Sequence, residues 1–179
     1  SQYEDSIEVF RATGACLFVR SSSFWEVGGF DNDFFAHQEE IDLCWRLKNK
    51  SHRIMVEPSS KVLHIGGATL EKSSPRKTYL NFRNNLYMLF KNLQLIDLFL
   101  IIPIRLVLDG IAAFIFLFKR NGFLHFLSII QAHFSFYLSI HKLIKKRTHI
   151  TQKNYHTGKI NNSILYLNKI KKRNKFSDL

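Results

Sequence analysis

Short apolar runs and stretches of helical spacing alternate along the first ninety residues. The apolar run 16–19 follows Gly14 and predicts a buried strand. Two further short runs, at 53–56 and 61–65, predict strands on either side of a turn at 57–60. The sequence therefore predicts several short strands separated by helices.

Three helices are predicted between and after these strands. Three serines precede 24–27, which predicts a capped short helix. The Gly28-Gly29 pair would end this helix because glycine adopts positive φ at little cost. Residues 37–50 have helical spacing, with carboxylates in the first turn and cations in the last, as the helix dipole favours. Pro75 opens another helix, in which apolar residues recur at steps of three and four.

The second half of the chain is more apolar than the first. Residues 93–118 are interrupted only by a proline and three charged side chains, of which Arg105 and Asp109 share one helix face. These interruptions make a poor spanning helix, so we expect a re-entrant or interfacial one. Residues 121–141 lack Lys, Arg, Asp and Glu, and predict an amphipathic helix lying on a bilayer. Hydropathy leaves the choice between spanning and interfacial placement open for 93–141.

Charge is unevenly distributed along the 179 residues. The formal net charge is +12, yet residues 1–118 hold 13 basic and 13 acidic side chains, whereas 119–179 hold 13 basic ones and only Asp178. This basic end suits an anionic membrane surface. Nucleic acid is not expected as a partner, because the cations adjoin aliphatic and Phe runs rather than a recognition module. Cys16 and Cys44 form no close pair, which favours a reducing compartment.

Three carboxylates lie within four residues at the start of the helix predicted over 37–50. They are Glu39, Glu40 and Asp42. Mutual repulsion raises the proton affinity of such groups while the helix dipole lowers it, and a group tuned between these effects suits general-base work. An acidic first turn that only stabilises the helix explains the same residues, and spacing alone does not decide between the two interpretations.

Four motifs follow one another in a fixed order. They are GGFD at 28–31, EEIDLCWR at 39–46, His64 ahead of Gly66-Gly67, and Arg83-Asn84. This set, within residues 13–93, resembles the C-terminal half of the catalytic domain of family 2 glycosyltransferases, particularly the bacterial rhamnosyltransferase-like members that build surface polysaccharides. The resemblance implies an α/β fold: an incomplete GT-A-type (Rossmann-like) mixed sheet followed by hydrophobic and amphipathic helices.

The resemblance also divides the chain into three parts. Residues 1–92 are expected to be the C-terminal half of the catalytic domain, 93–147 membrane-associating helices like the extensions of many members, and 148–179 a basic, loosely ordered tail. No signal peptide follows Ser1, so we expect the chain to be a fragment of a longer protein. Such a fragment would expose a sheet edge and is expected to be unstable or inactive alone.

Catalytic roles are implied by the same resemblance. Glu40 matches the base that deprotonates the acceptor hydroxyl, so that the anomeric carbon is attacked from the face opposite the nucleotide and its configuration inverts. The family usually carries Asp there, and Glu39 or Asp42 can share the role. Asp42 and Arg46 are otherwise expected to orient the helix.

Binding roles follow in the same way. Phe30 and Asp31 would line the acceptor pocket, and Arg83 would face either the donor diphosphate or solvent. His64 matches a histidine that helps to hold a divalent metal, Mg²⁺ or Mn²⁺, at the diphosphate. The main metal ligands are expected in an N-terminal half that this chain lacks, because Asp31-Asn32-Asp33 falls on the acceptor side.

The implied function is that of an inverting glycosyltransferase. It would move a sugar from a nucleotide-sugar donor to a saccharide or lipid-linked acceptor in cell-surface polysaccharide synthesis. It would act at the cytoplasmic face of the bacterial inner membrane, peripheral or partly embedded, on an anionic surface. The alternative is a non-catalytic, membrane-anchored module that binds a glycan or a partner.

Overall fold

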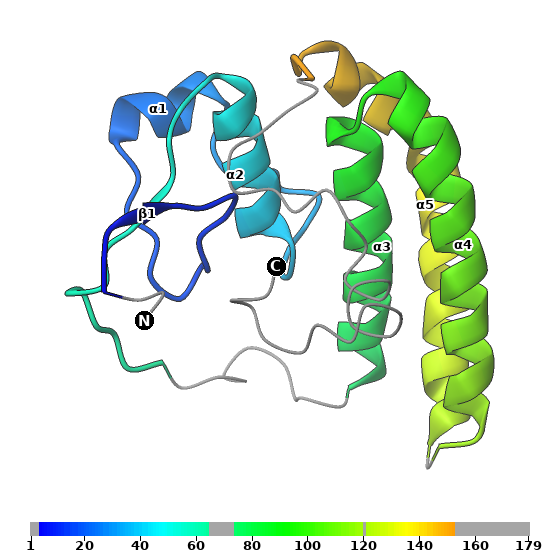
Figure 1. Cartoon of the computed structure of the whole chain (residues 1–179). Coiled ribbons are helices and arrows are strands. Elements are labelled where there is room, and N and C mark those ends of the chain that lie inside the picture. Colours follow the sequence, from blue (N-terminus) through cyan, green and yellow to red (C-terminus); the bar gives the residue numbers. More distant parts are fainter. Residues whose placement is uncertain (1–3, 65–73, 120, 153–179) are drawn as a thin grey trace.

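The computed structural model describes residues 4–64, 74–119 and 121–152. Within these ranges the strands are β1 (Ile7–Glu8) and β2 (Met55–Val56), and the helices are α1 (Ser21–Glu26), α2 (Glu39–Asn49), α3 (Pro75–Asn92), α4 (Leu95–Leu117) and α5 (Gly122–Thr148). Figure 1 shows α1, α2 and β1 on one side of the molecule and the three long helices side by side on the other. The described part of the chain is mostly helical.

The sheet is smaller than the sequence predicts. β1 pairs antiparallel with β2, Ile7 opposite Val56, and this pair is the whole sheet among the described residues. The predicted buried strand at 16–19 is wrong: the segment has no ladder partner, and Phe18 is 91% exposed. A strand needs a neighbour to satisfy its backbone groups, and an apolar run does not supply one. Residues 61–64 likewise form no strand, and Ile65 lies outside the described residues.

The mixed Rossmann-like sheet is therefore not formed by the described residues. The coarser part of the expectation, helices following a small strand-bearing unit, is confirmed. β1 was not predicted, because a two-residue strand carries no detectable periodicity.

The turn after α1 has the predicted conformation. Gly28 and Gly29 adopt φ of 78° and 66°, the left-handed region in which a Cβ is costly. A Cβ on Gly29 would also lie 2.9 Å from Phe24 Cε1, so this turn needs glycine for two reasons. The predicted serine cap is wrong: Arg20 occupies the N-cap, and Ser21 is already helical.

Helix α2 begins two residues later than predicted. His37 and Gln38 adopt left-handed φ of 69° and 74°, so neither continues an α-helix. The acidic first turn and basic last turn are present as predicted. Residues 42–49 of the helix are buried, which places α2 inside the molecule rather than on its surface.

The three long helices largely agree with the sequence pattern. Ser74 caps α3 by accepting a hydrogen bond from Lys77 N at 3.2 Å, with Pro75 in the first turn. α5 extends to Thr148, seven residues beyond the predicted end at 141, so the basic residues 142–147 belong to the helix.

Helix α5 packs against both α3 and α4, and α3 also contacts α4. Between α4 and α5, Asp109 is 1% exposed and binds Arg105 Nε at 2.8 Å and His133 Nε2 at 3.3 Å. The helix face that Arg105 and Asp109 were predicted to share thus lies toward α5.

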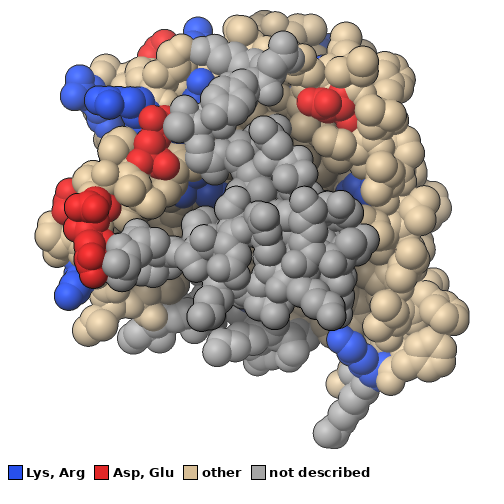
Figure 2. Space-filling view, viewed as in Figure 1, with Lys and Arg blue, Asp and Glu red and all other residues tan. Residues whose placement is uncertain are grey.

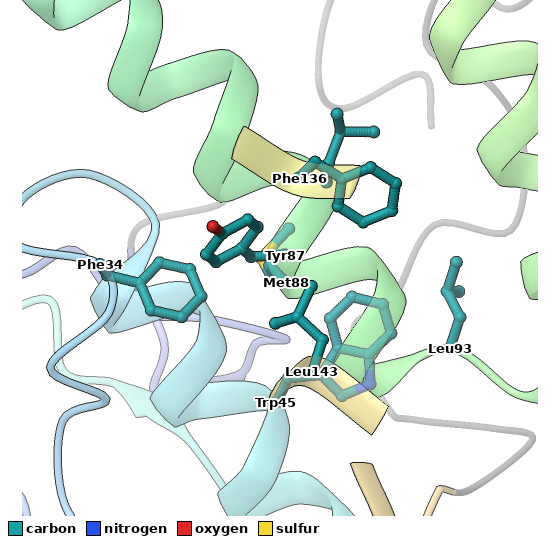
Figure 3. Close-up of a cluster of buried hydrophobic side chains, with 8 residues drawn as sticks. Phe34, Trp45, Tyr87, Met88, Leu93, Phe136 and Leu143 are labelled. Carbon is teal, nitrogen blue, oxygen red and sulfur yellow. The ribbon is translucent and has the colours of Figure 1, made fainter. Parts of the chain in front are cut away.

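One apolar cluster joins the strand-bearing unit to the helices (Figure 3). Its buried members are Phe34, Trp45, Leu86, Tyr87, Met88, Leu93, Phe136 and Leu143. They come from the loop before α2, from α2, from α3 and its end, and from α5. The boundary expected at 92/93 therefore runs through a shared core. The division at 92/93 stays a prediction, and residues 153–179 of the expected tail lie outside the described residues.

Candidate functional site

Two partly buried carboxylates begin helix α2. Glu39 and Glu40 lie in its first turn. Burial raises the pKa of Glu39 above its ordinary value, and the charge of Glu40 raises it further. Glu39 Oε2 has no hydrogen-bond partner among the described residues. A carboxylate of raised proton affinity with a free oxygen can accept or donate a proton.

A cleft of about 410 Å³ lies beside the second of these carboxylates. It is lined by Gly14, Leu17, Val19, Ser21, Phe24, Phe30 and Leu43. A Cβ on Gly14 would lie 3.7 Å from Glu40 Cβ, so Glu40 borders the wall of the cleft. Of the predicted site residues, Phe30 lines this cleft, whereas Glu40 neighbours the lining residue Gly14 without being part of the lining.

Asp42 is placed quite differently from its two neighbours. Its side chain is fully buried and accepts hydrogen bonds from Arg46 Nε at 2.8 Å, Lys91 Nζ at 2.9 Å and Asn92 Nδ2 at 2.8 Å. Arg46 Nη1 also donates to Val27 O at 2.5 Å, next to the glycine turn. These bonds fix α2 to α3 and to the glycine turn, the orienting role expected for Asp42 and Arg46.

The GGFD loop is bound by lysines from two helices. Lys91 Nζ of α3 lies 2.5 Å from Asp31 Oδ2, and Lys146 of α5 bonds to Asp31 as well. Although burial raises it, the pKa of Asp31 is held far below its ordinary value by Lys91 and Lys146. Burial lowers the pKa of Lys146, but its bonds to Asp31 and Asp33 raise it overall. Asp31, predicted to line an acceptor pocket, is thus the centre of an ion-pair network.

The loop before α2 is held by a buried amide. Asn84 Nδ2 lies 2.8 Å from each of the carbonyl oxygens of Phe34, Ala36 and His37. These residues lead directly into Glu39, and His37 has the left-handed conformation described above. Asn84 therefore sets the position of the carboxylates without reaching them.

Arg83 lies on α3, beside Asn84, and lines a second cavity rather than the cleft next to Glu40. This cavity of about 540 Å³ is lined by Asn32, Asp33, Phe35, Arg76, Tyr79, Leu80 and Arg83. Arg83 Nη2 donates to Asp33 O at 2.7 Å, and its guanidinium lies 5.2 Å from the ring centroids of Tyr79 and Tyr87. Arg83 is neither on a free solvated face nor at the Glu40 cleft.

His64 is not part of a metal-binding cluster among the described residues. Its side chain is exposed, and the described residues contain no group of three or more His, Cys, Asp and Glu side chains that could hold a metal ion. Asp31 and Asp33 are neutralised by lysines instead. Because the main ligands are expected outside this chain, binding of a divalent ion near His64 stays a prediction.

Sequence reasoning missed Lys91, Asn92 and Lys146. Lys91 and Asn92 are 1% exposed each, at positions where an amphipathic helix should bury apolar side chains. That mismatch was the available signal, since a buried polar group needs a partner. Lys146 gave no such signal, because a lysine near the end of a basic helix is ordinarily solvated.

Helices α4 and α5 are long and apolar enough to cross a membrane. Over windows of 18 residues their mean hydropathy reaches 2.3 and 1.3, with 11% and 22% of the windows buried. Length and composition alone give weak support for membrane association.

Part of the chain is similar to bacterial glycosyltransferases. Over 52 residues it is 44% identical to N-acetylglucosaminyl-diphospho-decaprenol L-rhamnosyltransferase of Mycobacterium tuberculosis, covering 29% of this chain and 17% of that protein. Over 65 residues it is 37% identical to pre-mycofactocin glycosyltransferase of the same organism, covering 36% and 14%. Over 64 residues it is 38% identical to rhamnosyltransferase WbbL of Escherichia coli K12, covering 36% and 24%.

The matched stretches thus span less than a quarter of each of these relatives. No family model matches the chain. No solved structure matches it either.

Proposed function

We propose that this chain is the acceptor-side part of an inverting glycosyltransferase. It would move a sugar from a nucleotide-sugar donor to a saccharide or lipid-linked acceptor in cell-surface polysaccharide synthesis. The observation that carries the proposal is the cleft lined by Phe30 and bordered by Glu40, at the start of a helix whose sequence is typical of the family. The partial similarity to bacterial rhamnosyltransferases supports it.

Glu40 acts as the general base in this proposal. Its carboxylate accepts the proton of an acceptor hydroxyl held in the cleft, and the freed oxygen forms a bond to the anomeric carbon of the donor. The bond from that carbon to the nucleotide phosphate breaks on the opposite side, and the nucleotide leaves with the electron pair. Attack and departure on opposite faces invert the configuration.

The residues around Glu40 would contribute differently to the reaction. Asp42 cannot be the base in this arrangement, because its side chain is fully buried and bonded to Arg46, Lys91 and Asn92. Glu39 stays available to share the proton, since its pKa is raised by burial and by the charge of Glu40. The phenyl ring of Phe30, 46% exposed at the cleft, would pack against a sugar ring.

The proposal also includes the location of the protein in the cell and a divalent metal ion. Helices α4 and α5 would attach the protein to the cytoplasmic face of the bacterial inner membrane. A divalent ion, Mg²⁺ or Mn²⁺, would neutralise charge on the departing nucleotide. His64 would offer it at most one ligand among the described residues.

Substitution of Glu40, paired with a control substitution elsewhere, tests its assignment as the general base. Glu40→Gln should lower turnover by about 10²–10⁴-fold, the usual contribution of a general base, while leaving donor affinity unchanged. Glu57→Gln, at a fully exposed carboxylate, is the matched control and should have no effect. Turnover is measured in the complete enzyme, of which this chain is proposed to be the acceptor-side part, as acceptor-dependent release of nucleotide.

Unchanged turnover in Glu40→Gln would overturn the base assignment. Loss of activity in Glu39→Gln but not in Glu40→Gln would move the role to the neighbouring carboxylate, which also contradicts the proposal. If no nucleotide-sugar is bound or consumed, the function is that of a non-catalytic glycan- or partner-binding module.

A further inference from the structure

The outer surface of helix α4 is apolar without interruption. Its exposed residues between Leu95 and Leu117 comprise only Leu, Ile, Val, Phe, Pro and Gly. Of its three charged residues, Asp109 is buried, Arg105 binds Asp109, and Asp97 is partly exposed in the first turn. An exposed apolar face of this length, free of charge, is unusual on a soluble protein.

Helix α5 continues this surface. Its exposed apolar side chains include Phe123, Leu127, Ile130, Phe134, Tyr137 and Leu138. They recur at three- and four-residue steps and so form one stripe. In Figure 2 the right-hand side of the molecule, over the long helices, shows few charged side chains. We call the exposed apolar residues of α4 and α5 the outer face.

Helix α3 covers the opposite side of α5 and also contacts α4. Near its start, Thr78 Oγ1 lies 2.7 Å from His125 Nδ1 of α5. Near its end, Arg147 Nη1 of α5 donates to Phe90 O at 2.7 Å. α3 and α5 thus run parallel and side by side, as Figure 1 shows.

This packing decides how the helices can meet a bilayer. If α5 crossed the membrane, α3 would enter the hydrocarbon beside it. Arg83 of α3 would carry with it the loop to whose Asp33 carbonyl it donates. Charged side chains and irregular backbone at that depth are strongly unfavourable. The outer face, by contrast, can enter lipid while α3 stays in water.

Three of the four cations at the end of α5 are bound within the protein, and Lys145 is exposed. Lys142 and Lys146 bind Asp33, and Lys146 also binds Asp31. Arg147 donates to a backbone carbonyl. Within the described residues, apolar contact is therefore the larger source of attraction to a membrane, and charge the smaller one.

We infer that the outer face of α4 and α5 lies in the plane of a lipid bilayer, with both helices immersed along their length in the interfacial layer and neither crossing it. The occupant of this face is the boundary of lipid headgroups and acyl chains. The placement keeps α3, the GGFD loop and the Glu40 cleft on the aqueous side. It holds whether or not the transferase function is correct.

Depth measurements along α4 test the placement. Leu100, Val107 and Phe114 share the outer face at seven-residue spacing and are 59–64% exposed. Each is replaced singly by cysteine and spin-labelled in a Cys16→Ser background, with the fully buried Cys44 left in place. The full chain is bound to phosphatidylcholine vesicles, which carry no net charge, and label depth is measured by EPR power saturation.

Equal depths at the three positions are expected for helices that lie in the plane. A spanning helix would instead place the label at 107 deepest, with those at 100 and 114 near opposite headgroup layers, separated by about 21 Å along the axis. That graded result would overturn the inference.

A charge substitution provides the matched control. Val107→Glu on the outer face should weaken vesicle partitioning by roughly tenfold or more, because a carboxylate is expelled from the interface. Leu63→Glu, at a fully exposed leucine away from these helices, should leave it unchanged. Equal partitioning of the two variants, or no partitioning of the unaltered chain, would also overturn the inference.

Discussion

Removal of the charge of Lys91 should lower the free energy of unfolding substantially. Its ammonium lies 2.5 Å from Asp31 Oδ2 and 2.9 Å from Asp42 Oδ1, and its side chain is 2% exposed. Lys91→Met keeps the aliphatic stem and removes the charge. Both carboxylates would then remain inside the protein without their shared cation.

The expected loss of unfolding free energy follows from burial. Removing one partner of a buried ion pair costs about 3–5 kcal/mol, because the other charge stays desolvated. Asp42 would keep its bonds from Arg46 and Asn92, and Asp31 its bond from Lys146. We therefore expect a loss near the lower end, about 3 kcal/mol.

Urea unfolding at neutral pH, followed by far-UV circular dichroism, measures this loss from the midpoint at constant slope. Lys142→Met is the matched control: it removes the same charge from an ion pair with Asp33 whose lysine side chain is 60% exposed, and should cost at most about 1 kcal/mol. A Lys91→Met loss no larger than that of Lys142→Met would refute the assignment of Lys91 as a buried structural cation.

Two further predictions concern the GGFD loop. The pKa of Asp31 is lowered in the folded state, so its carboxylate stabilises the fold at pH above its ordinary pKa of 3.8, and this contribution is lost as pH falls through the folded pKa. Asp31→Asn should therefore flatten the dependence of unfolding free energy on pH below about 4. An unchanged pH dependence, measured by urea unfolding at several pH values, would contradict the network. Gly29→Ala should destabilise the protein more than Gly28→Ala. Both glycines have positive φ, but only a Cβ at position 29 would contact Phe24, at 2.9 Å. Equal midpoints of thermal unfolding for the two variants would contradict this prediction.

Helices were the part of the fold that the sequence made predictable. Their apolar residues recur at steps that fit one helix face, and Pro75 and the glycine pair mark a start and an end by local chemistry. The start of α2 was misplaced by two residues because His37 and Gln38 adopt left-handed backbone, held through contacts of Asn84 with carbonyls near 50 residues away. Such long-range contacts leave no local pattern.

Among the described residues only one of the three predicted strands is found, the one at 53–56, where β2 (Met55–Val56) lies. The run at 16–19 is apolar enough to be a strand but finds no partner among the described residues, whereas Ile7–Glu8 pairs with Met55–Val56 without any periodicity of its own. Pairing depends on which segments meet in space, and one segment cannot indicate that.

The surroundings of the candidate site residues also depend on segments that are distant in the sequence. Phe30 lines a cleft and Glu40 lies next to Gly14 at its wall, while their binding and catalytic roles stay predictions. Asp31, from the same motif, is instead bound by Lys91 and Lys146, which lie 60 and 115 residues further along the chain. Contacts between distant segments decide which of these polar residues bind one another, and motif order does not indicate such contacts.

Acceptor-dependent release of nucleotide tests the central claim most directly. The complete enzyme, of which this chain is proposed to be the acceptor-side part, is incubated with a panel of nucleotide-sugars, including nucleotide-activated L-rhamnose, with and without saccharide and lipid-diphosphate acceptors. The anomeric configuration of the product is read by NMR. We predict nucleotide release that requires an acceptor, a product of inverted configuration, and loss of both in Glu40→Gln. Release with retained configuration, or release unaffected by Glu40→Gln, would contradict the account.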